Sequence, residues 1–263
     1  MSMKILVFVK QVPDTVDVKI DPKTGNICRD GVQSTVNPYD MNAIEAALQI
    51  KEAVGGTICA VSMGPPQAMA VLDHALAMGC DECYLLSDRA FGGADTLATG
   101  YTLAKAAEKI GDYDLLLFGK CATDAETAQT APIVAEFLGL PQVTLADSLE
   151  IKDGWAYCRR DLGSSFQDVK VKLPAMVSVT ENINNPRFPT AKGIFTRGRK
   201  PHYTWDAAAA ECDTARTGAA GSPSVNKKIF EPPKHNTDTS YFTGEIEEMA
   251  KAFVDALEAE HKI

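Results

Sequence analysis

Apolar runs of strand length alternate along the first part of the chain with stretches whose apolar residues recur at helical spacing. The pattern predicts strands over Lys4–Lys10, Thr57–Ser62, Cys83–Ser87, Asp114–Gly119 and near Gln142–Leu149. It predicts helices over 38–54, 65–78, 95–110 and 126–138. This alternation favours right-handed crossovers and a parallel sheet with helices on both faces. We therefore expect an α/β fold with a doubly wound, mostly parallel sheet.

The pattern changes after residue 150. Trp155–Arg160 and Phe166–Lys172 alternate apolar and polar side chains around Gly163-Ser-Ser, which predicts a β-hairpin, and Leu173–Thr180 reads as a buried strand. Residues 217–239 are rich in Gly, Ser and Pro, so we expect an extended arm. The arm leads into a helix whose apolar face holds Ile246, Met249, Ala250, Phe253, Val254 and Leu257. Such an arm has no core of its own, so we expect it to wrap its own domain or another subunit.

Charge and cysteine content narrow the class of protein. The chain has 26 Lys+Arg against 35 Asp+Glu, a net charge of −9, which argues against nucleic acid as the main partner but allows a single nucleotide. The seven cysteines are scattered and odd in number, and the first apolar run is too short for a signal sequence. No run reaches the roughly 18 apolar residues of a membrane span. We expect a cytoplasmic protein.

Each segment that follows a predicted parallel strand carries groups suited to binding an anion. Asn37-Pro38-Tyr39-Asp40 has the features of a helix start, and Met63-Gly64-Pro65 allows close backbone approach. Ser87–Thr96 contains paired glycines and a capping residue, Asp95 or Thr96. Gly119–Gln129 places Thr123 or Asp124 before the next helix. Ligands of open parallel sheets bind at this edge, so these loops form the predicted site.

The same features also allow purely structural interpretations. The first two segments can be plain helix starts, and the paired glycines can form an ordinary turn. Residues 182–205 contain no acid and can be a solvated basic face; their cations are Arg187, Lys192, Arg197, Arg199 and Lys200. Cys80-Asp-Glu-Cys83 follows a helix stop rather than opening a helix, so we interpret it as structural rather than redox-active. No standard dinucleotide, phosphate-loop or hydrolase motif and no metal-binding spacing occurs.

Taken together, these segments resemble the beta subunit of the electron transfer flavoproteins over essentially the whole chain. The matching segments are Val9-Lys10-Gln11-Val12-Pro13-Asp14, Asp30-Gly31-Val32, Asn37-Pro38-Tyr39-Asp40 with Met41, Ser62-Met-Gly-Pro-Pro66, Ala77-Met-Gly79, Gly119-Lys120 with Ala128-Gln129, Leu140-Pro-Gln-Val-Thr144 and Asn185-Pro-Arg187. The resemblance implies a Rossmann-like adenine-nucleotide or FAD-binding domain over 1–216. It implies that 217–263 wraps an alpha subunit in an obligate heterodimer.

The resemblance also implies the chemistry. Plain members bind AMP as a structural ligand, whereas electron-bifurcating members bind FAD, which accepts a hydride from NADH. Their electrons go to ferredoxin or flavodoxin and, through the alpha-subunit FAD, to a dehydrogenase of the acyl-CoA type. The stretch Ser87–Thr96 is similar to the bifurcating group, so we expect FAD, with AMP as the alternative. A stand-alone nucleotide-binding protein is a third, more distant possibility.

Carried over position by position, the resemblance implies a set of contact residues. We expect no catalytic side chain and no metal ligand. The expected cofactor-binding residues are Phe8, Lys10, Asn37, Pro38, Tyr39, Asp40, Met63, Gly64, Arg89, Phe91, Gly93, Ala94, Asp95, Thr96, Lys120, Cys121, Ala122, Thr123, Asp124, Thr127, Ala128, Gln129, Thr130 and Ala131. The basic residues Arg187, Lys192, Arg197, Arg199 and Lys200 are expected to dock on the partner dehydrogenase. Cys121, Thr123 and Ala125-Glu126 depart from the family's usual residues.

Overall fold

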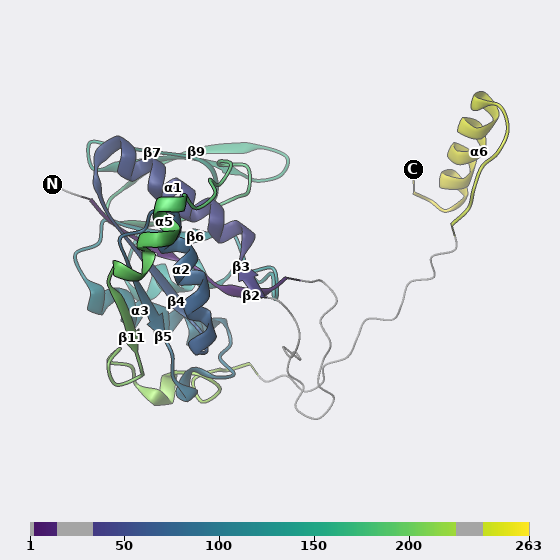
Figure 1. The fold of residues 1–263 in the computed structure, drawn as a ribbon. Coiled ribbons are helices and arrows are strands. Elements are labelled where there is room, and N and C mark those ends of the chain that lie inside the picture. The colour runs from purple at the N-terminus through teal and green to yellow at the C-terminus, as the bar shows by residue number, and fades with distance from the viewer. Residues whose placement is uncertain (1–2, 15–33, 225–238, 263) are drawn as a thin grey trace. The chain divides into compact units, whose positions relative to one another are not determined.

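A computed structural model of the chain describes residues 3–14, 34–224 and 239–262 (Figure 1). The chain divides into two compact units, Met1–Lys227 and Lys228–Ile263. The boundary expected after residue 216 stays a prediction. The matched segment Asp30-Gly31-Val32 and residues 225–238 of the expected arm lie outside the described residues.

The first unit is built on a sheet which, in the described residues, has nine strands in the order β11-β5-β4-β1-β6-β10-β7-β8-β9. They are β1 (Met3–Phe8), β4 (Gly56–Met63), β5 (Glu82–Leu86), β6 (Leu115–Gly119), β7 (Gln142–Lys152), β8 (Trp155–Asp161), β9 (Phe166–Lys172), β10 (Ala175–Val179) and β11 (His202–Trp205). The strands from β11 to β7 run parallel, and β8 pairs antiparallel with β7 and β9. Strands β2 (Gln11–Pro13) and β3 (Ser34–Val36) form a separate antiparallel pair. The predicted doubly wound sheet and hairpin are confirmed.

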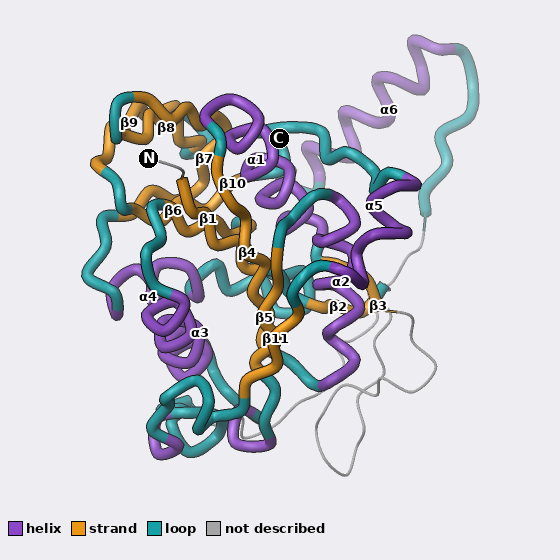
Figure 2. The backbone as a smooth tube through the Cα atoms, turned by 60° about the vertical axis from the view of Figure 1, so that its left-hand side comes forward, coloured by secondary structure: helices purple, strands orange, loops and turns teal. Residues whose placement is uncertain are grey.

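Helices cover both faces of this sheet (Figure 2). The helices are α1 (Pro38–Val54), α2 (Met69–Met78), α3 (Thr96–Ile110), α4 (Thr130–Phe137) and α5 (Ala191–Thr196), with short 3-10 turns η1 (Pro66–Ala68), η2 (Arg89–Phe91), η3 (Arg197–Arg199) and η4 (Thr214–Arg216). Strand β1 shows why two faces are buried: Ile5 and Val7 join the core with α1 and α2, while Leu6 and Phe8 join the core with α3 and α4. A strand buried on both sides is apolar at nearly every position, and in β1 Lys4 is the one polar residue.

Several elements differ from the predictions. The helix expected from residue 65 begins at Met69, after the 3-10 turn η1. Helix α4 begins at Thr130 rather than at residue 126, because Glu126 and Ala128 have positive φ angles of 49° and 53° that a right-handed helix excludes. The first strand ends at Phe8 instead of Lys10. Strand β11 was not predicted; His202–Trp205 is short and mostly exposed, so its sequence lacks the alternation of a half-buried strand.

The second unit contains α6 (Ile246–Ala259), the helix predicted to end the chain. Most of its apolar residues are exposed, as in Ile246 at 79% and Phe253 at 52%, and the Phe253 ring meets Phe242 edge to face with ring centroids 5.9 Å apart. Across the described residues, no helix combines the length and the apolar character needed to cross a membrane.

Candidate functional site

The strand order changes direction between β1 and β6. In open α/β sheets the carboxyl ends of the two strands at such a point line the ligand-binding crevice, and we call this position the crevice. Strands β4 and β5 follow on one side of β1, and β6 and β10 lie on the other. Loops that leave β1 and β6 therefore diverge to opposite faces, and ligands of open α/β sheets bind in the gap. The predicted residues lie at this edge: Phe8 and Lys10 at the end of β1, Asn37–Asp40 at the start of α1, Met63 and Gly64 after β4, Arg89–Thr96 after β5 and Lys120–Ala131 after β6.

Asn37 joins the loops on the two sides of the crevice. It is fully buried at the N-cap position of α1, followed by Pro38, as the sequence predicted. Its side chain does not cap the helix. Instead, its Nδ2 donates to the carbonyl oxygen of Cys121 at 2.8 Å, and its Oδ1 accepts from the Thr123 amide at 3.2 Å. Because both contacts use the backbone, the departures at 121 and 123 leave this link intact.

Asp40 and Lys10 form a second link across the crevice. The Lys10 amide donates to Asp40 Oδ2 at 2.8 Å, and Lys10 Nζ pairs with Asp124 Oδ1 at 2.7 Å. Burial raises the pKa of Asp40 to about 7, although hydrogen bonds from Asn37, Lys10 and Gly119 oppose this change. A Cβ atom at Gly119 would lie 2.5 Å from Asp40 Oδ1, so glycine is required for the close approach.

The loops after β4 and β5 connect to the same edge. The Gly64 amide donates to the Leu86 carbonyl at 3.0 Å, which ties the end of β4 to that of β5. The Thr96 hydroxyl donates to Gln129 Oε1 at 3.0 Å, which ties the start of α3 to the loop before α4. The loops that sequence reasoning grouped therefore lie together.

The loop between β5 and α3 is held by a segment that the sequence did not connect to it. Asp95 caps α3 by accepting from the Leu97 and Ala98 amides, each at 3.0 Å. Its other oxygen accepts from the Ser224 amide at 3.1 Å, while its own amide donates to Ser222 Oγ at 2.8 Å. Residues 217–224 thus pack on the glycine-containing loop. Only the contacts reveal this, because no sequence pattern links the two segments.

The N-terminus of α4 is equipped to receive a phosphate. No side chain caps this helix, since Gln129 at its N-cap is engaged by Thr96. The first amides of a helix have no partner within it, and here they follow the exposed loop 125–129. The nearby lysines are already paired, Lys10 with Asp124 and Lys120 with Glu181. The backbone amides at this helix start, together with the exposed Arg89, are therefore the donors at this edge that could hold a phosphate.

Three expected contact residues, Phe8, Phe91 and Ala131, lie in the core. Phe8 is 4% exposed and stacks on Phe118 with ring centroids 4.2 Å apart, and Phe91 is 5% exposed. These side chains pack in the core beneath the loops of this edge. Gly93 has a φ of 72°, which favours glycine, and Arg89 is exposed. Lys120 Nζ also lies over the Tyr39 ring at 4.8 Å.

The basic segment separates into two kinds of residue. The side chains of Arg187 and Lys200 bind within the chain: Arg187 to Glu45 and Glu52, Lys200 to the carbonyl oxygens of Leu76 and Cys80. The salt bridges of the described residues include none from Lys192, Arg197 or Arg199. Sequence reasoning missed the apolar members of this surface, Phe188 at 90% and Phe195 at 83% exposure. Two phenylalanines in a basic stretch without acidic residues were the available signal.

The structure agrees with a structural role for Cys80 and Cys83. Both thiols are buried, and burial raises the pKa of each to about 12. The six cysteines of the described residues are free, and those residues contain no cluster of side chains that could hold a metal ion.

Comparison with known proteins places these features in context. A family described as the electron transfer flavoprotein domain matches residues 24–210. The electron transfer flavoprotein subunit beta of Thermoanaerobacterium thermosaccharolyticum is 43% identical over 264 residues, covering 99% of this chain and 100% of the relative. Caffeyl-CoA reductase-Etf complex subunit CarD of Acetobacterium woodii is 41% identical, covering 99% and 100%. Protein FixA of Bradyrhizobium diazoefficiens is 36% identical, covering 97% and 91%.

Proposed function

Because the chain belongs to the electron transfer flavoprotein family as a beta subunit, we propose that it is the FAD-binding subunit of an electron-bifurcating complex in the cytoplasm. When bound, FAD supplies the redox chemistry: it accepts a hydride from NADH and releases one electron to ferredoxin or flavodoxin and the other, through the alpha-subunit FAD, to an acyl-CoA dehydrogenase type of partner. The observation that carries the proposal is the glycine-containing loop Arg89–Thr96, tied to the nucleotide edge through Thr96 and Gln129.

The chain's own residues bind and orient the cofactor. The amides at the start of α4 receive the phosphates, and the links from Asn37 to 121–123 and from Lys10 to Asp124 hold the two sides of the crevice at a fixed spacing. Residues 217–224 hold the Arg89–Thr96 loop in place. A fixed environment around a flavin sets its potential, so these links serve the redox chemistry without a catalytic side chain.

One observation favours the alternative, a non-bifurcating subunit that binds AMP. Asp88 accepts from the Ala90 and Ala207 amides, and Asp95 accepts from three amides. The acids of the loop are thus satisfied within the chain, and the loop needs no flavin to be complete. In this alternative the subunit is a binding and scaffolding protein without a redox centre of its own.

The partners follow from the same proposal. The amphipathic helix α6 binds the alpha subunit, with which the chain forms a heterodimer. The basic and aromatic surface around α5, with Lys192, Arg197 and Arg199, docks on the dehydrogenase, where an acidic partner surface is complementary. The similarity to a subunit of a caffeyl-CoA reductase-Etf complex supports a CoA-ester oxidoreductase as that partner.

Counting the cofactors tests the proposal directly. The heterodimer is purified, its nucleotides are extracted and separated, and NADH is then added with ferredoxin present. We expect two FAD and no AMP per heterodimer, and ferredoxin reduction that depends on the dehydrogenase and its substrate. One FAD and one AMP per heterodimer, with no reduction by NADH, would establish the alternative instead.

A further inference from the structure

Residues 180–201, which we call the crossing segment, span the sheet from β10 to β11. Strands β6, β1, β4 and β5 lie between these two strands. At about 4.8 Å per strand spacing, the segment bridges about 24 Å. It passes α1 and α2 and carries α5 with the basic and aromatic surface.

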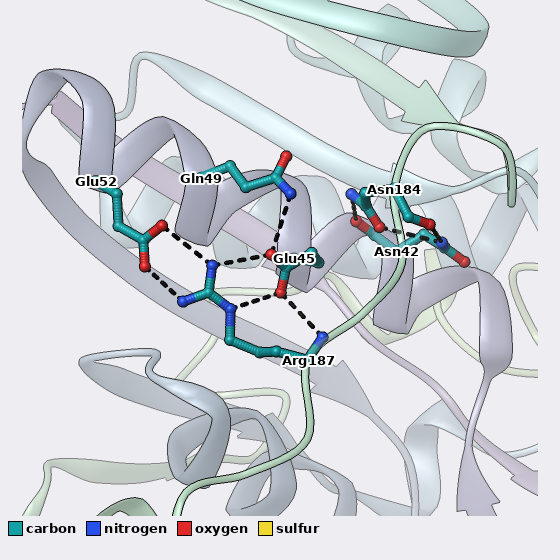
Figure 3. A network of polar contacts seen from close by, with 6 residues as sticks. All are labelled: Asn42, Glu45, Gln49, Glu52, Asn184 and Arg187. Carbon is teal, nitrogen blue, oxygen red and sulfur yellow. Dashed lines mark hydrogen bonds and ion pairs between the residues drawn. The ribbon is translucent and has the colours of Figure 1, made fainter.

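Arg187 fastens the start of the crossing segment to α1 (Figure 3). Its Nε and Nη2 donate to the two oxygens of Glu45 at 2.8 and 2.9 Å, and its own amide donates to Glu45 Oε2 at 3.2 Å. Its Nη1 and Nη2 also donate to Glu52. Most donors of a guanidinium are thereby used in planar, two-point pairs, and few are left for a second protein. These contacts raise the pKa of Arg187, so its charge is permanent.

The neighbouring residues extend this attachment toward the nucleotide edge. Asn184 Nδ2 donates to the Asn42 carbonyl at 3.0 Å, and Asn42 Nδ2 donates back to the Asn184 carbonyl at 3.0 Å. Glu181 pairs with Lys120, which directly follows β6. The start of the crossing segment is thus fastened along α1 (Figure 3).

Lys200 fastens the other end. Its Nζ donates to the carbonyl oxygen of Leu76, in the last turn of α2, at 2.8 Å and to that of Cys80, just beyond the helix, at 2.5 Å. His202 lies nearby, with Nε2 3.0 Å from Asp73. Between the two fastened ends, Phe188 and Phe195 are exposed at 90% and 83%.

We propose that Arg187 and Lys200 are positioning residues: they fix the two ends of the crossing segment, and the residues between them meet the partner. This inference rests on the docking role proposed above. It assigns two of the five basic residues to the fold of the segment and leaves Lys192, Arg197 and Arg199 as the charged docking residues.

Glu45 provides the decisive test, because its side chain is only 5% exposed and therefore has almost no surface with which to touch a partner. Arg187→Gln, Glu45→Gln and the matched control Arg199→Gln are made in the full chain and purified as the heterodimer. We expect hydrogen exchange of the 188–199 amides to rise about tenfold in the first two variants and to stay unchanged in the third.

The second measurement is the rate of electron transfer to an acyl-CoA dehydrogenase at increasing salt. Glu45→Gln and Arg187→Gln should both slow it by about tenfold without changing its salt dependence. Arg199→Gln should reduce the salt dependence itself. If Glu45→Gln docks like the unaltered protein while Arg187→Gln does not, Arg187 touches the partner and the inference is wrong.

Folding and function can be separated in this design. If Glu45→Gln does not fold, Glu52→Gln removes only the outer, 59% exposed carboxylate, and its exchange should rise by a smaller factor. Unchanged exchange in every variant overturns the inference. If the unaltered protein transfers no electrons to the dehydrogenase, the docking proposal fails, and the exchange measurement still decides whether Arg187 fixes the segment.

Discussion

Asp40 is a single buried side chain that should make the free energy of unfolding depend on pH. Its pKa is raised by burial to about 7, from 3.8 in the unfolded chain. Between these values the folded protein holds a proton that the unfolded chain has released. The free energy of unfolding should therefore fall as pH rises from about 4 to about 7, and level off above that.

Urea unfolding at about pH 5 and about pH 8 measures this effect. Relative to Asp40→Asn, which carries no titrating group, the unaltered protein should lose on the order of 3 kcal/mol between the two conditions. Parallel curves for the two proteins would show that Asp40 does not hold its proton in the fold.

Asp95 joins the glycine-containing loop Arg89–Thr96 to residues 217–224. Asp95→Ala removes the acceptor of three amides, so we expect a loss of about 2 kcal/mol in unfolding free energy and weaker FAD retention. Asp213→Ala, which removes a turn cap at Ala215, is the matched control. Hydrogen exchange of 217–224 should rise in the first variant only. Equal hydrogen exchange of 217–224 in both variants would show that Asp95 does not hold this segment in place.

At the residue scale, the sequence predicted where a residue lies in the fold better than which groups its side chain binds. Asn37 was placed correctly at a helix start, but its side chain joins the loop at 121–123 instead of capping. The partner of the Asn37 side chain lies more than 80 positions away along the chain. Local helix propensity carries no information about such a partner. The same holds for Arg187, whose partners lie on a helix far back in the chain.

At the scale of elements, the contact between α5 and α2 depends on one glycine. A Cβ atom at Gly193 would overlap the carbonyl oxygen of Ala77, whereas a Cβ at Gly198 meets nothing within 4 Å. Gly193→Ala should displace α5 and cost about 1–3 kcal/mol, and Gly198→Ala should be nearly neutral.

Thermal unfolding and electron transfer to the dehydrogenase check this pair of variants. Both measurements should change for Gly193→Ala alone. A loss of stability and electron transfer of equal size in Gly198→Ala would mean that any added side chain disturbs the segment. The contact between Gly193 and α2 would then not be the cause.

The elements that were predicted well are those whose burial is decided locally. Strands β1, β4, β5 and β6 contain runs of buried apolar residues because both faces of the sheet are covered. Helix α4 was predicted too early, since the sequence does not reveal that Glu126 and Ala128 adopt left-handed angles. Strand β11 is stabilised by pairing with β5, a contact between segments more than a hundred residues apart.

At the scale of the whole molecule, we expect the last residues of the first unit to stabilise that unit, and the second unit to be needed for the heterodimer. A chain ending at Lys227 keeps residues 217–224, including the fully buried Thr217 and the bond from the Ala219 amide to the Gly92 carbonyl. A chain ending at Arg216 loses them. We expect the shorter chain to melt on the order of 5 °C lower, and neither to form the heterodimer.

Calorimetry and size-exclusion with the alpha subunit test both parts. Equal melting temperatures would show that 217–224 does not stabilise the loop beside it. Heterodimer formation by the chain ending at Lys227 would remove α6 from the proposed interface.

The crossing segment has a consequence for how such proteins diverge. Its ends are fixed by Arg187 and Lys200, whose contacts belong to the fold, while the side chains between them contribute little to the core. Substitutions of the exposed side chains between 188 and 199 therefore leave folding almost untouched, with Gly193, which contacts α2, as the exception. With the docking role proposed above, two copies of the gene could acquire different electron acceptors after a duplication through this short stretch alone, and both would keep the proposed cofactor edge.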